Sequence, residues 1–293
     1  MSVDQSPLVI KAPAKINLGL AILGKRPDGF HDLVSIFHAI SLCDEVALTA
    51  RDRGISMSCD VPGIPVGPEN LVWQAADLVQ SEFGISSGVH IDLRKRIAAG
   101  AGLGGGSSDA AAVVRGLCDM WNIDAPHAVV HELCARLGSD VPFFLTGGTA
   151  LVEGRGERIT PFDIDEELML VVAMPSVHVP TGWAYSQLHR PFRHPQDYLE
   201  QIEHLRGGRI RLVDFCRTLR NDFQTPIERH HPEIARVRGL LESCGATAAL
   251  MTGSGAAVFG AFESEDAAES AAHTISAEVP CVVAHSLKRN PPI

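Results

Sequence analysis

Hydrophobic and polar residues alternate along the first part of the chain in the way that a half-buried β-strand requires. Within residues 8–23, the apolar side chains from Ala14 to Ile22 stand at every second position and therefore share one face. Turn-forming residues follow at 25–29 and an apolar segment at 33–42, so the pattern predicts a hairpin. Further strands are expected at residues 45–50, 88–93 and 148–153.

Apolar residues at helical spacing lie between and after these strands. The segments with this spacing are residues 70–83, 108–120 and 126–137. Gly138 is expected to end the last of these helices, because glycine is favoured just after the final helical residue. The first half of the chain is therefore expected to combine strands with helices.

A second structural unit is expected in the remainder of the chain. Its strands are predicted at residues 168–174, 247–251, 256–262 and 281–286, and its helices at 181–188, 232–244 and 264–277. The resulting order β-α-β-β-α-β, with one insertion, is a ferredoxin-like plan. We therefore predict an α+β protein with two domains, residues 1–161 and 162–293, and a boundary near Pro161.

The segment 100–112 carries the clearest chemical signal. It holds five glycines within seven residues, followed by two serines and an alanine-rich helix. Glycine lets backbone N–H groups converge on an anion, and the helix directs its unpaired N–H groups and positive dipole end to the same point. Three cations at residues 94–96 precede the loop. We therefore predict a phosphate cradle formed by Ala98, Ala99, Gly100, Ala101, Gly102, Leu103, Gly104, Gly105, Gly106, Ser107 and Ser108.

Two other interpretations of this loop are weaker. A flexible linker would not run directly into a strong helix. The glycines also satisfy G-x-G-x-x-G, but a dinucleotide fold needs an acidic residue at the end of a second strand. Asp119 and Asp124 have about the right spacing, yet both lie where the helix ends and no apolar strand precedes them. The dinucleotide interpretation is therefore rejected.

Composition narrows the class of partner. The formal net charge is −10, which argues against a nucleic-acid partner, and no apolar run is long enough to span a membrane. Seven cysteines without a C-x-x-C pair indicate reduced thiols and a cytoplasmic location. The oligomeric state is left open between monomer and homodimer. His127, His131 and Cys134 share a predicted helix face, but a fourth metal ligand is missing, so no metal site is expected.

Three segments together resemble the motifs of the GHMP small-molecule kinases: residues 13–18, the glycine-serine loop, and residues 251–259. The resemblance implies a ribosomal-protein-S5-like ATP-binding domain followed by the ferredoxin-like domain. It also implies ATP as the nucleotide, with Mg²⁺ carried by it. Gly253 and Gly255 of the third motif are expected to pack against the phosphate loop. The motifs of P-loop ATPases and protein kinases are absent from the sequence.

Residues 25–31 and 138–142 are similar to the branch of that family that phosphorylates diphosphocytidyl-methylerythritol, in the non-mevalonate route to isoprenoids. The resemblance implies transfer of the ATP γ-phosphate to the 2-hydroxyl of that acceptor. It assigns Asp140 as the general base and a substrate-binding residue, and Lys15 as its assistant. Asn17, on the same strand face as Lys15, is expected to bind substrate as well. The simplest structural role for Asp140 is an N-cap on the next turn, which is compatible with that assignment.

The expected substrate pocket is built from aromatic residues. The resemblance implies that a ring at position 30 stacks on cytosine and that His31 bonds to the polar edge of the base. Phe30 stands where the family usually has tyrosine, so the stacking face is kept and a hydroxyl is lost. Tyr185 matches the ring on the other face of the base, with Trp183 as the alternative. Stacking contributes about 1–3 kcal/mol per base.

The remaining expectations concern the nucleotide. Asn70 and Lys95 match family positions near the base of ATP. Ser107 or Ser108 is expected to touch Mg²⁺ or a phosphate, and Asp109 to stabilise the helix dipole rather than to bind metal.

Two rival functions stay open. One is another GHMP kinase, of the homoserine or mevalonate type, and the other is a non-catalytic nucleotide-binding regulator on the same fold. A regulator would be expected to lack the base or the lysine, whereas this chain retains both Asp140 and Lys15.

Overall fold

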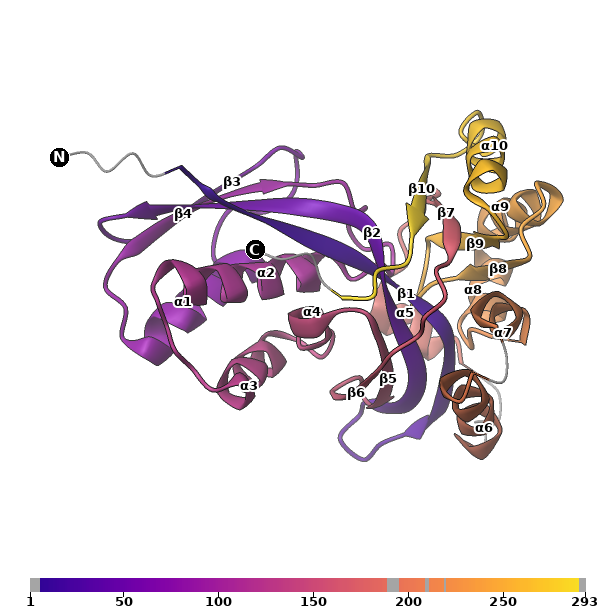
Figure 1. The fold of residues 1–293 in the computed structure, drawn as a ribbon, viewed down its shortest axis with the longest axis horizontal. Coiled ribbons are helices and arrows are strands. Elements are labelled where there is room, and N and C mark those ends of the chain that lie inside the picture. Colours follow the sequence, from indigo (N-terminus) through magenta and orange to yellow (C-terminus); the bar gives the residue numbers. More distant parts are fainter. Residues whose placement is uncertain (1–5, 189–194, 209–210, 219, 290–293) are drawn as a thin grey trace.

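The computed structural model describes residues 6–188, 195–208, 211–218 and 220–289. Its first part is a six-stranded sheet covered by helices (Figure 1). The strands are β1 (Leu8–Lys25), β2 (His31–Arg51), β3 (Ile55–Cys59), β4 (Gly88–Arg94), β5 (Thr149–Gly154) and β6 (Arg158–Phe162). The helices are α1 (Leu71–Phe83), α2 (Gly105–Met120), α3 (His127–Leu137) and α4 (Phe143–Thr146).

The predicted hairpin of the first two strands forms the spine of this sheet. β1 and β2 pair antiparallel along nearly their whole length, and the sheet order is β3-β4-β2-β5-β6, with β1 attached to β2. The segments 33–42 and 45–50 were expected as two strands but form the single strand β2. The intervening Cys43 and Asp44 still pair with β1, because a register shift at Pro13 and Ala14 absorbs the irregularity.

The second part contains a four-stranded antiparallel sheet. Its strands are β7 (Met169–Ala173), β8 (Ala248–Met251), β9 (Val258–Phe262) and β10 (Cys281–His285), in the order β10-β7-β9-β8. Helix α10 (Glu265–Ile275) connects β9 to β10. Between β7 and β8 lie α5 (Thr181–Ser186), α6 (Pro195–Arg206), α7 (Leu212–Thr218), α8 (Gln224–His230) and α9 (Pro232–Ser243). This order confirms the ferredoxin-like plan with an insertion.

Apolar side chains on one face of β1 pack in the core between the two sheets. Ile16 and Leu18 are fully buried and belong to a core cluster that includes Leu170 and Val172 of β7 and Phe259 of β9. The opposite face of β1 carries Lys15 and Asn17 toward the helices and the loop of the first part. The period-two pattern therefore places the apolar residues up to Leu18 between the sheets and leaves the polar pair on the side of the glycine loop. The expected shared face does not extend to Leu20 and Ile22, which belong to the other core cluster, because the register shifts after Asn17.

Several elements have no clear signal in the sequence. β3 and β6 were not predicted, and most of the side chains of β6 are exposed or half-buried. The insertion helices α6, α7 and α8 were not predicted either. The phosphate-loop helix α2 begins at Gly105, three residues before the expected start. The proposed domain boundary at Pro161 lies within β6, and the second sheet begins with β7.

Candidate active site

The glycine-rich loop is held in a conformation that only glycine adopts readily. Gly100, Gly102 and Gly104 have φ values of 69°, 80° and 73°. A Cβ atom on Gly102 would lie 2.4 Å from the carbonyl oxygen of Thr252. Gly104 is the N-cap of α2 and has no side chain to satisfy the first N–H groups of the helix, so these groups are left for a ligand.

Backbone hydrogen bonds fasten this loop to the other two motifs. The N–H of Lys15 donates to the carbonyl oxygen of Leu103 (2.9 Å), and the N–H of Ala257 donates to that of Ala101 (3.1 Å). A Cβ atom on Gly253 would come within 3.0 Å of the Gly102 carbonyl oxygen. The first and third motifs therefore support the loop from both sides, as expected for the glycines of the third motif.

Lys15 and Asp140 meet beside the loop. The Lys15 ammonium lies 3.8 Å from Asp140 Oδ2, donates to Asn17 Oδ1 (2.6 Å) and stands 4.6 Å from the centre of the Phe37 ring. The Lys15 side chain is 5 % exposed and that of Asp140 is 34 % exposed. Burial lowers the pKa of Lys15, and the charge on Asp140 partly opposes that shift. A buried cation thus faces a carboxylate that solvent, and therefore a substrate, can reach.

Asn17 positions Lys15 through a buried network. Asn17 Oδ1 also accepts a hydrogen bond from Thr252 Oγ1 (3.2 Å), and Asn17 Nδ2 donates to Ser35 Oγ (2.9 Å). Asn17 is only 2 % exposed. Its amide contacts these protein groups, and its contact with substrate stays a prediction. Sequence reasoning missed Thr252, although it lies within the third motif.

Asp140 does not cap a helix, so that part of the prediction was wrong. Helix α4 has Pro142 as its N-cap, and no side chain of the described residues caps it. The reason is that the Asp140 side chain turns toward the Lys15 ammonium instead. The carboxylate is therefore not held by α4.

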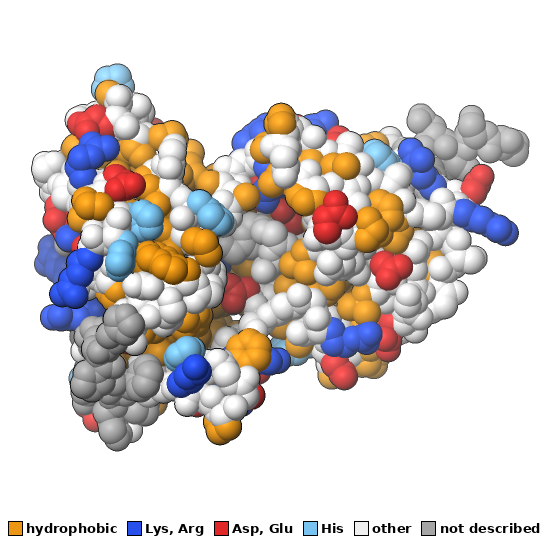
Figure 2. All heavy atoms as spheres, turned by 180° about the vertical axis from the view of Figure 1, so that it is seen from behind, with side chains coloured by type: hydrophobic (Ala, Val, Ile, Leu, Met, Phe, Trp, Pro, Cys, Tyr) orange, Lys and Arg blue, Asp and Glu red, His pale blue; other side chains and the backbone are white. Residues whose placement is uncertain are grey.

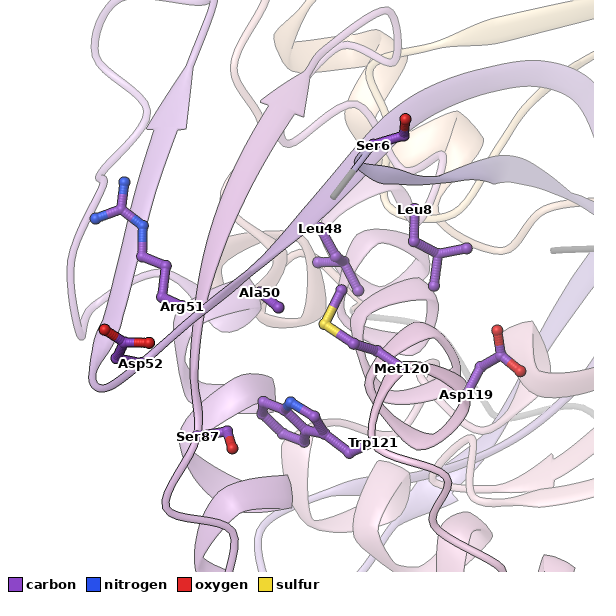
Figure 3. Close-up of a pocket in the computed structure, with 10 residues that line it drawn as sticks. All are labelled: Ser6, Leu8, Leu48, Ala50, Arg51, Asp52, Ser87, Asp119, Met120 and Trp121. Atoms are coloured by element: carbon purple, nitrogen blue, oxygen red, sulfur yellow. The ribbon is translucent and has the colours of Figure 1, made fainter. Parts of the chain in front are cut away.

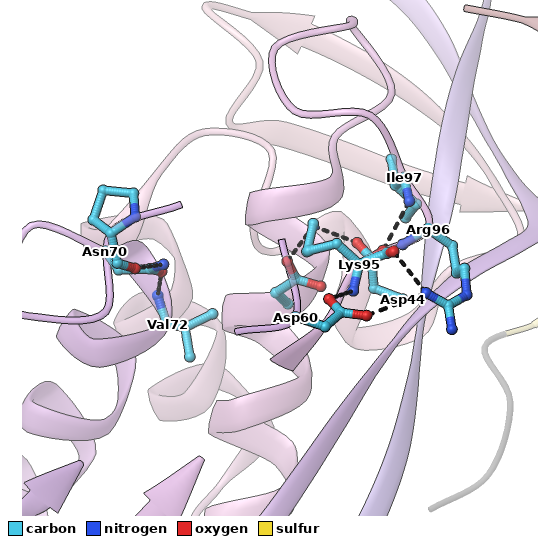
Figure 4. Close-up of polar contacts among 9 residues, drawn as sticks. Asp44, Asp60, Asn70, Val72, Lys95, Arg96 and Ile97 are labelled. Atoms are coloured by element: carbon cyan, nitrogen blue, oxygen red, sulfur yellow. Dashed lines mark hydrogen bonds and ion pairs between the residues drawn. The ribbon is translucent and has the colours of Figure 1, made fainter. Parts of the chain in front are cut away.

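Lys95 lies in a buried group of charges beneath the loop (Figure 4). Its ammonium donates to Asp109 Oδ2 (2.6 Å) and to Asp44 Oδ2, and the side chains of all three are at most 7 % exposed. Asp44 Oδ1 also accepts the backbone N–H groups of Arg96 and Ile97. Burial raises the pKa of Asp109 to about 7 against the opposing charge of Lys95.

This arrangement gives two predicted residues contacts that the sequence did not suggest, and the place of Lys95 near the nucleotide base stays a prediction. Asp109 was expected to stabilise the dipole of α2, but it is a buried ion-pair partner of Lys95. The Lys95 ammonium was expected near the nucleotide base, and here two carboxylates hold it; a Cβ atom on Gly105 would lie 3.2 Å from it. Sequence reasoning missed Asp44, which is 51 residues from Lys95 and lies in an ordinary strand.

Other predicted nucleotide-binding residues have defined contacts in the structure. Asn70 caps α1 by accepting the N–H of Val72 (2.9 Å) and donates to the Pro65 carbonyl oxygen (Figure 4). Ser108 Oγ is buried and has no hydrogen-bond partner among the described residues, whereas Ser107 is half-buried. Ser108 therefore presents a free hydroxyl at the beginning of α2.

The predicted base-binding residues line a separate cavity of about 700 Å³. It contains Phe30, His31 and Tyr185, although Tyr185 lies in the second half of the chain. The His31 ring stacks on Tyr185 with 4.7 Å between centroids and 22° between planes. Burial raises the pKa of Tyr185 to about 12, and the charge on Asp140 adds to this shift. The cavity lies close to Asp140, because Arg155 lines it and a Cβ atom on the adjoining Gly156 would lie 3.9 Å from Asp140 Oδ1.

Trp183 faces away from this cavity. Its ring contacts those of His230 and His231, with centroids 5.2 and 5.6 Å apart. Trp183 does not line the cavity, whereas Tyr185 does. The geometry therefore favours Tyr185 as the second ring. Figure 2 shows the molecule hollowed between its two parts, with acidic and basic side chains interspersed over this face.

A cavity of about 830 Å³ lies elsewhere, beside the C-terminal end of α2 (Figure 3). Met120 and Trp121 point into it, together with Leu8 of β1 and Leu48 of β2. None of the predicted site residues lines it, so size alone does not identify the active site.

His127 and His131 share one face of α3, within the part of the chain that the structure describes. The His127 and His131 rings are 6.3 Å apart, and no group of three or more His, Cys, Asp or Glu side chains there is arranged to hold a metal ion. None of the helices in the same residues combines the length and apolarity needed to cross a membrane.

Comparison with known proteins agrees with this geometry. Residues 70–148 match the GHMP kinases N terminal domain, and residues 202–281 match the GHMP kinases C terminal model. A 4-diphosphocytidyl-2-C-methyl-D-erythritol kinase of Geobacter metallireducens is 40 % identical over 92 % of this chain and 94 % of its own length. The enzyme of the same name from Chlorobaculum parvum is 41 % identical over 91 % and 93 %.

Among solved structures, kinases from two branches of the family differ in their sequence identity to this chain. A crystal structure of 4-(cytidine 5'-diphospho)-2C-methyl-D-erythritol kinase has a TM-score of 0.81 and 35 % identity, covering 95 % of this chain and 99 % of that one. A homoserine kinase from Cytophaga hutchinsonii has a TM-score of 0.76 over 99 % and 97 %, but only 18 % identity, and so shares the fold alone. The chain belongs to the GHMP kinases and, within them, to the 4-diphosphocytidyl-2-C-methyl-D-erythritol kinases.

Proposed function

We propose that this enzyme transfers the γ-phosphate of ATP to the 2-hydroxyl of 4-diphosphocytidyl-2-C-methyl-D-erythritol, giving the 2-phosphate and ADP. The observation that carries the proposal is the Lys15–Asp140 pair, which lies between a glycine-rich anion cradle and an aromatic cavity. A phosphoryl donor and a nucleotide-containing acceptor would meet at that pair.

The cradle serves the donor. Phosphoryl transfer leaves little covalent chemistry for the protein, which must align the reacting oxygens and neutralise charge. We assign the triphosphate to the loop from Gly100 to Gly106 and to the free N–H groups at the beginning of α2. The loop is held to β1 and to the third motif by backbone hydrogen bonds, so it needs little rearrangement to bind the donor.

Mg²⁺ arrives with ATP as part of the substrate. The chemistry of the site suits it, because Mg²⁺ prefers oxygen ligands and the buried Ser108 hydroxyl has no partner among the described residues. We propose Ser107 or Ser108 as the protein hydroxyl nearest the ion or a phosphate. The ion would neutralise charge that develops on the phosphate oxygens.

Asp140 and Lys15 serve the acceptor. The acceptor hydroxyl loses its proton to the Asp140 carboxylate as its oxygen forms a bond to the γ-phosphorus, and the bond from that phosphorus to the ADP oxygen breaks. Lys15 stabilises the negative charge that develops on the attacking oxygen and lowers the pKa of the hydroxyl. Its burial makes this effect stronger than that of an exposed lysine, since water screens it less.

The aromatic cavity selects the cytidylyl group. We propose that Phe30 and Tyr185 supply stacking surfaces and that His31 binds the polar edge of cytosine. His31 lies on Tyr185 in this structure, so binding of the base between the rings requires His31 to move aside. All seven cysteines are free, which supports our proposal of a cytoplasmic enzyme acting on small molecules.

The test is ADP release with MgATP and each of four acceptors: the cytidylyl compound, free methylerythritol phosphate, mevalonate and homoserine. Turnover with the cytidylyl compound alone supports the proposal. Turnover only with homoserine or mevalonate would keep the kinase activity and refute the proposed substrate. ATP binding without turnover of any acceptor would instead favour a non-catalytic regulator.

A further inference from the structure

Two buried hydroxyl groups lie on either side of the Asn17 amide, and neither takes part in the proposed mechanism. Ser35 Oγ accepts a hydrogen bond from Asn17 Nδ2 (2.9 Å), and Thr252 Oγ1 donates one to Asn17 Oδ1 (3.2 Å). Ser35 and Thr252 are both fully buried. Asn17 Oδ1 also accepts a hydrogen bond from the Lys15 ammonium (2.6 Å). The orientation of this amide therefore decides whether Lys15 meets an oxygen or an NH₂ group.

The other partners of the two hydroxyls fix that orientation. The Ser35 hydroxyl donates its proton to the Gly19 carbonyl oxygen (2.7 Å), so toward Asn17 it can only accept. The Thr252 oxygen accepts the backbone N–H of Asn17 (2.9 Å), and its single proton is donated to Oδ1. A rotated amide would turn its NH₂ group toward two donors, the Lys15 ammonium and the Thr252 hydroxyl. It would also turn its oxygen toward Ser35, whose proton is already donated. The polarity of the hydrogen bonds thus directs Oδ1 toward Lys15.

The Thr252 hydroxyl is itself held in place by a constrained loop. The Thr252 carbonyl oxygen accepts the N–H of Gly255 (3.0 Å). Asn221, which is buried, donates from Nδ2 to the carbonyl oxygens of Met251 and Gly253, on either side of Thr252 (2.7 Å each). The backbone on both sides of Thr252 is therefore fixed by a residue about thirty positions away in the sequence.

Thr252 contacts both the donor side and the acceptor side of the reaction centre. A Cβ atom on Gly102 of the phosphate loop would lie 2.4 Å from the Thr252 carbonyl oxygen, whereas the Thr252 hydroxyl bonds to Asn17. The transferred phosphoryl group and the charge that stabilises the attacking oxygen must be aligned with each other. We propose that Thr252 is a positioning residue, whose hydroxyl fixes the Asn17 oxygen and thereby places the Lys15 ammonium for the reaction. This inference rests on the proposed function, in which Lys15 stabilises the attacking oxygen.

The experiment compares two substitutions that each remove one half of the Thr252 side chain. Thr252→Val keeps the methyl group and loses the hydroxyl, whereas Thr252→Ser keeps the hydroxyl and loses the methyl group. Steady-state kinetics are measured with MgATP and whichever of the four acceptors the wild type phosphorylates. Thr252→Val should lower kcat about ten- to a hundredfold, because a misplacement of about 1 Å has effects of this size. The KM for ATP should change less than about threefold, and Thr252→Ser should keep kcat within about threefold of wild type.

A matched control and a double substitution show how Thr252 acts. Thr149→Val is the control, because it removes another buried threonine hydroxyl, which bonds to His38 Nδ1 (2.8 Å). It should leave kcat unchanged even where it lowers the melting temperature. In a Lys15→Met background, Thr252→Val should lower kcat no further, since the group that it positions is already absent.

Unchanged kcat in Thr252→Val would overturn the proposal. An equal loss in Thr252→Ser would overturn it too, because packing and not the hydroxyl would then be responsible. A further loss in the Lys15→Met background would show that Thr252 acts through the phosphate loop instead. A failure of the proposed function appears in the wild type alone: turnover of a different acceptor refutes only the proposed substrate, whereas turnover of none refutes the function and this inference with it.

Discussion

Replacing Lys15 with methionine should make the protein more stable and nearly inactive. Lys15 is buried, and burial lowers its pKa below the usual value in spite of the neighbouring Asp140. The unfolded chain therefore binds the lysine proton more tightly than the folded chain does, and at neutral pH the charged lysine destabilises the fold. A methionine side chain fits the same kind of space without that cost.

The structure allows the change in the free energy of unfolding and the loss in kcat to be estimated. Asp140 remains solvated in the variant, and Asn17 Oδ1 still accepts a hydrogen bond from the Thr252 hydroxyl. Neither former partner of Lys15 is therefore left buried without a hydrogen bond. The free energy of unfolding should therefore rise by about 1 kcal/mol, at the low end of what removal of buried charge yields. For catalysis, two unit charges 3.8 Å apart at an effective dielectric constant of about 20 interact by about 4 kcal/mol. That value sets a loss of about a thousandfold in kcat as the upper limit.

Urea denaturation and ADP release measure the two effects on the same preparations. Lys11→Met is the control, because Lys11 is exposed on the same strand and should change neither quantity. Loss of activity together with a fall in stability of 2 kcal/mol or more would refute the reasoning, since Lys15 would then be a structural ion-pair partner. Full activity in Lys15→Met would remove Lys15 from the mechanism.

Three further perturbations test other parts of the site and the fold. Asp140→Asn should lower kcat by about a thousandfold while calorimetry shows unchanged ATP binding; near-native turnover would exclude Asp140 as the base. Gly102→Ala should weaken ATP binding at least about tenfold, because its Cβ would lie 2.4 Å from the Thr252 carbonyl oxygen, whereas Gly239→Ala on α9, with open space around it, should not. Burial lowers the pKa of His38 to about 4, so the unfolded chain gains this proton first as the pH falls. Stability should therefore fall by up to about 3 kcal/mol between about pH 6.5 and 4, and urea denaturation of His38→Asn should lack that part of the slope.

The sequence predicted those features of the fold that depend on local periodicity. The alternation from Ala14 to Leu18 identified the face of β1 that packs between the sheets, but Leu20 and Ile22 belong to the other core cluster, because the register shifts after Asn17. The strand order of the second part followed from its element order. β6 was not predicted because its residues are exposed or half-buried and its sequence does not alternate between apolar and polar residues. The continuity of β2 was not predicted because the irregularity at Ser41 and Leu42, which have no partner in β1, interrupts the alternation of β2.

The site was predictable where its parts are near one another in sequence. Lys15 and Asn17 are two residues apart on a strand, so they had to share a face, and a hydrogen bond joins them. The glycine loop could be identified from the sequence because its positive φ angles favour glycine. Phe30, His31 and Tyr185 could be brought together only through the family resemblance, since no local pattern connects them.

The charges around Lys95 show why the rest of the site had to come from three-dimensional structure. Three consecutive cations before a phosphate loop suggest direct attraction of an anion. In the fold, however, Lys95 reaches Asp44 on β2 and Asp109 on α2, while Arg94 and Arg96 pair with Glu45 and Asp60. Asp44 also holds the backbone at residues 96 and 97, where the chain turns toward the loop. The cations therefore fix the approach to the cradle, and the backbone N–H groups at the start of α2 are left to meet the phosphates.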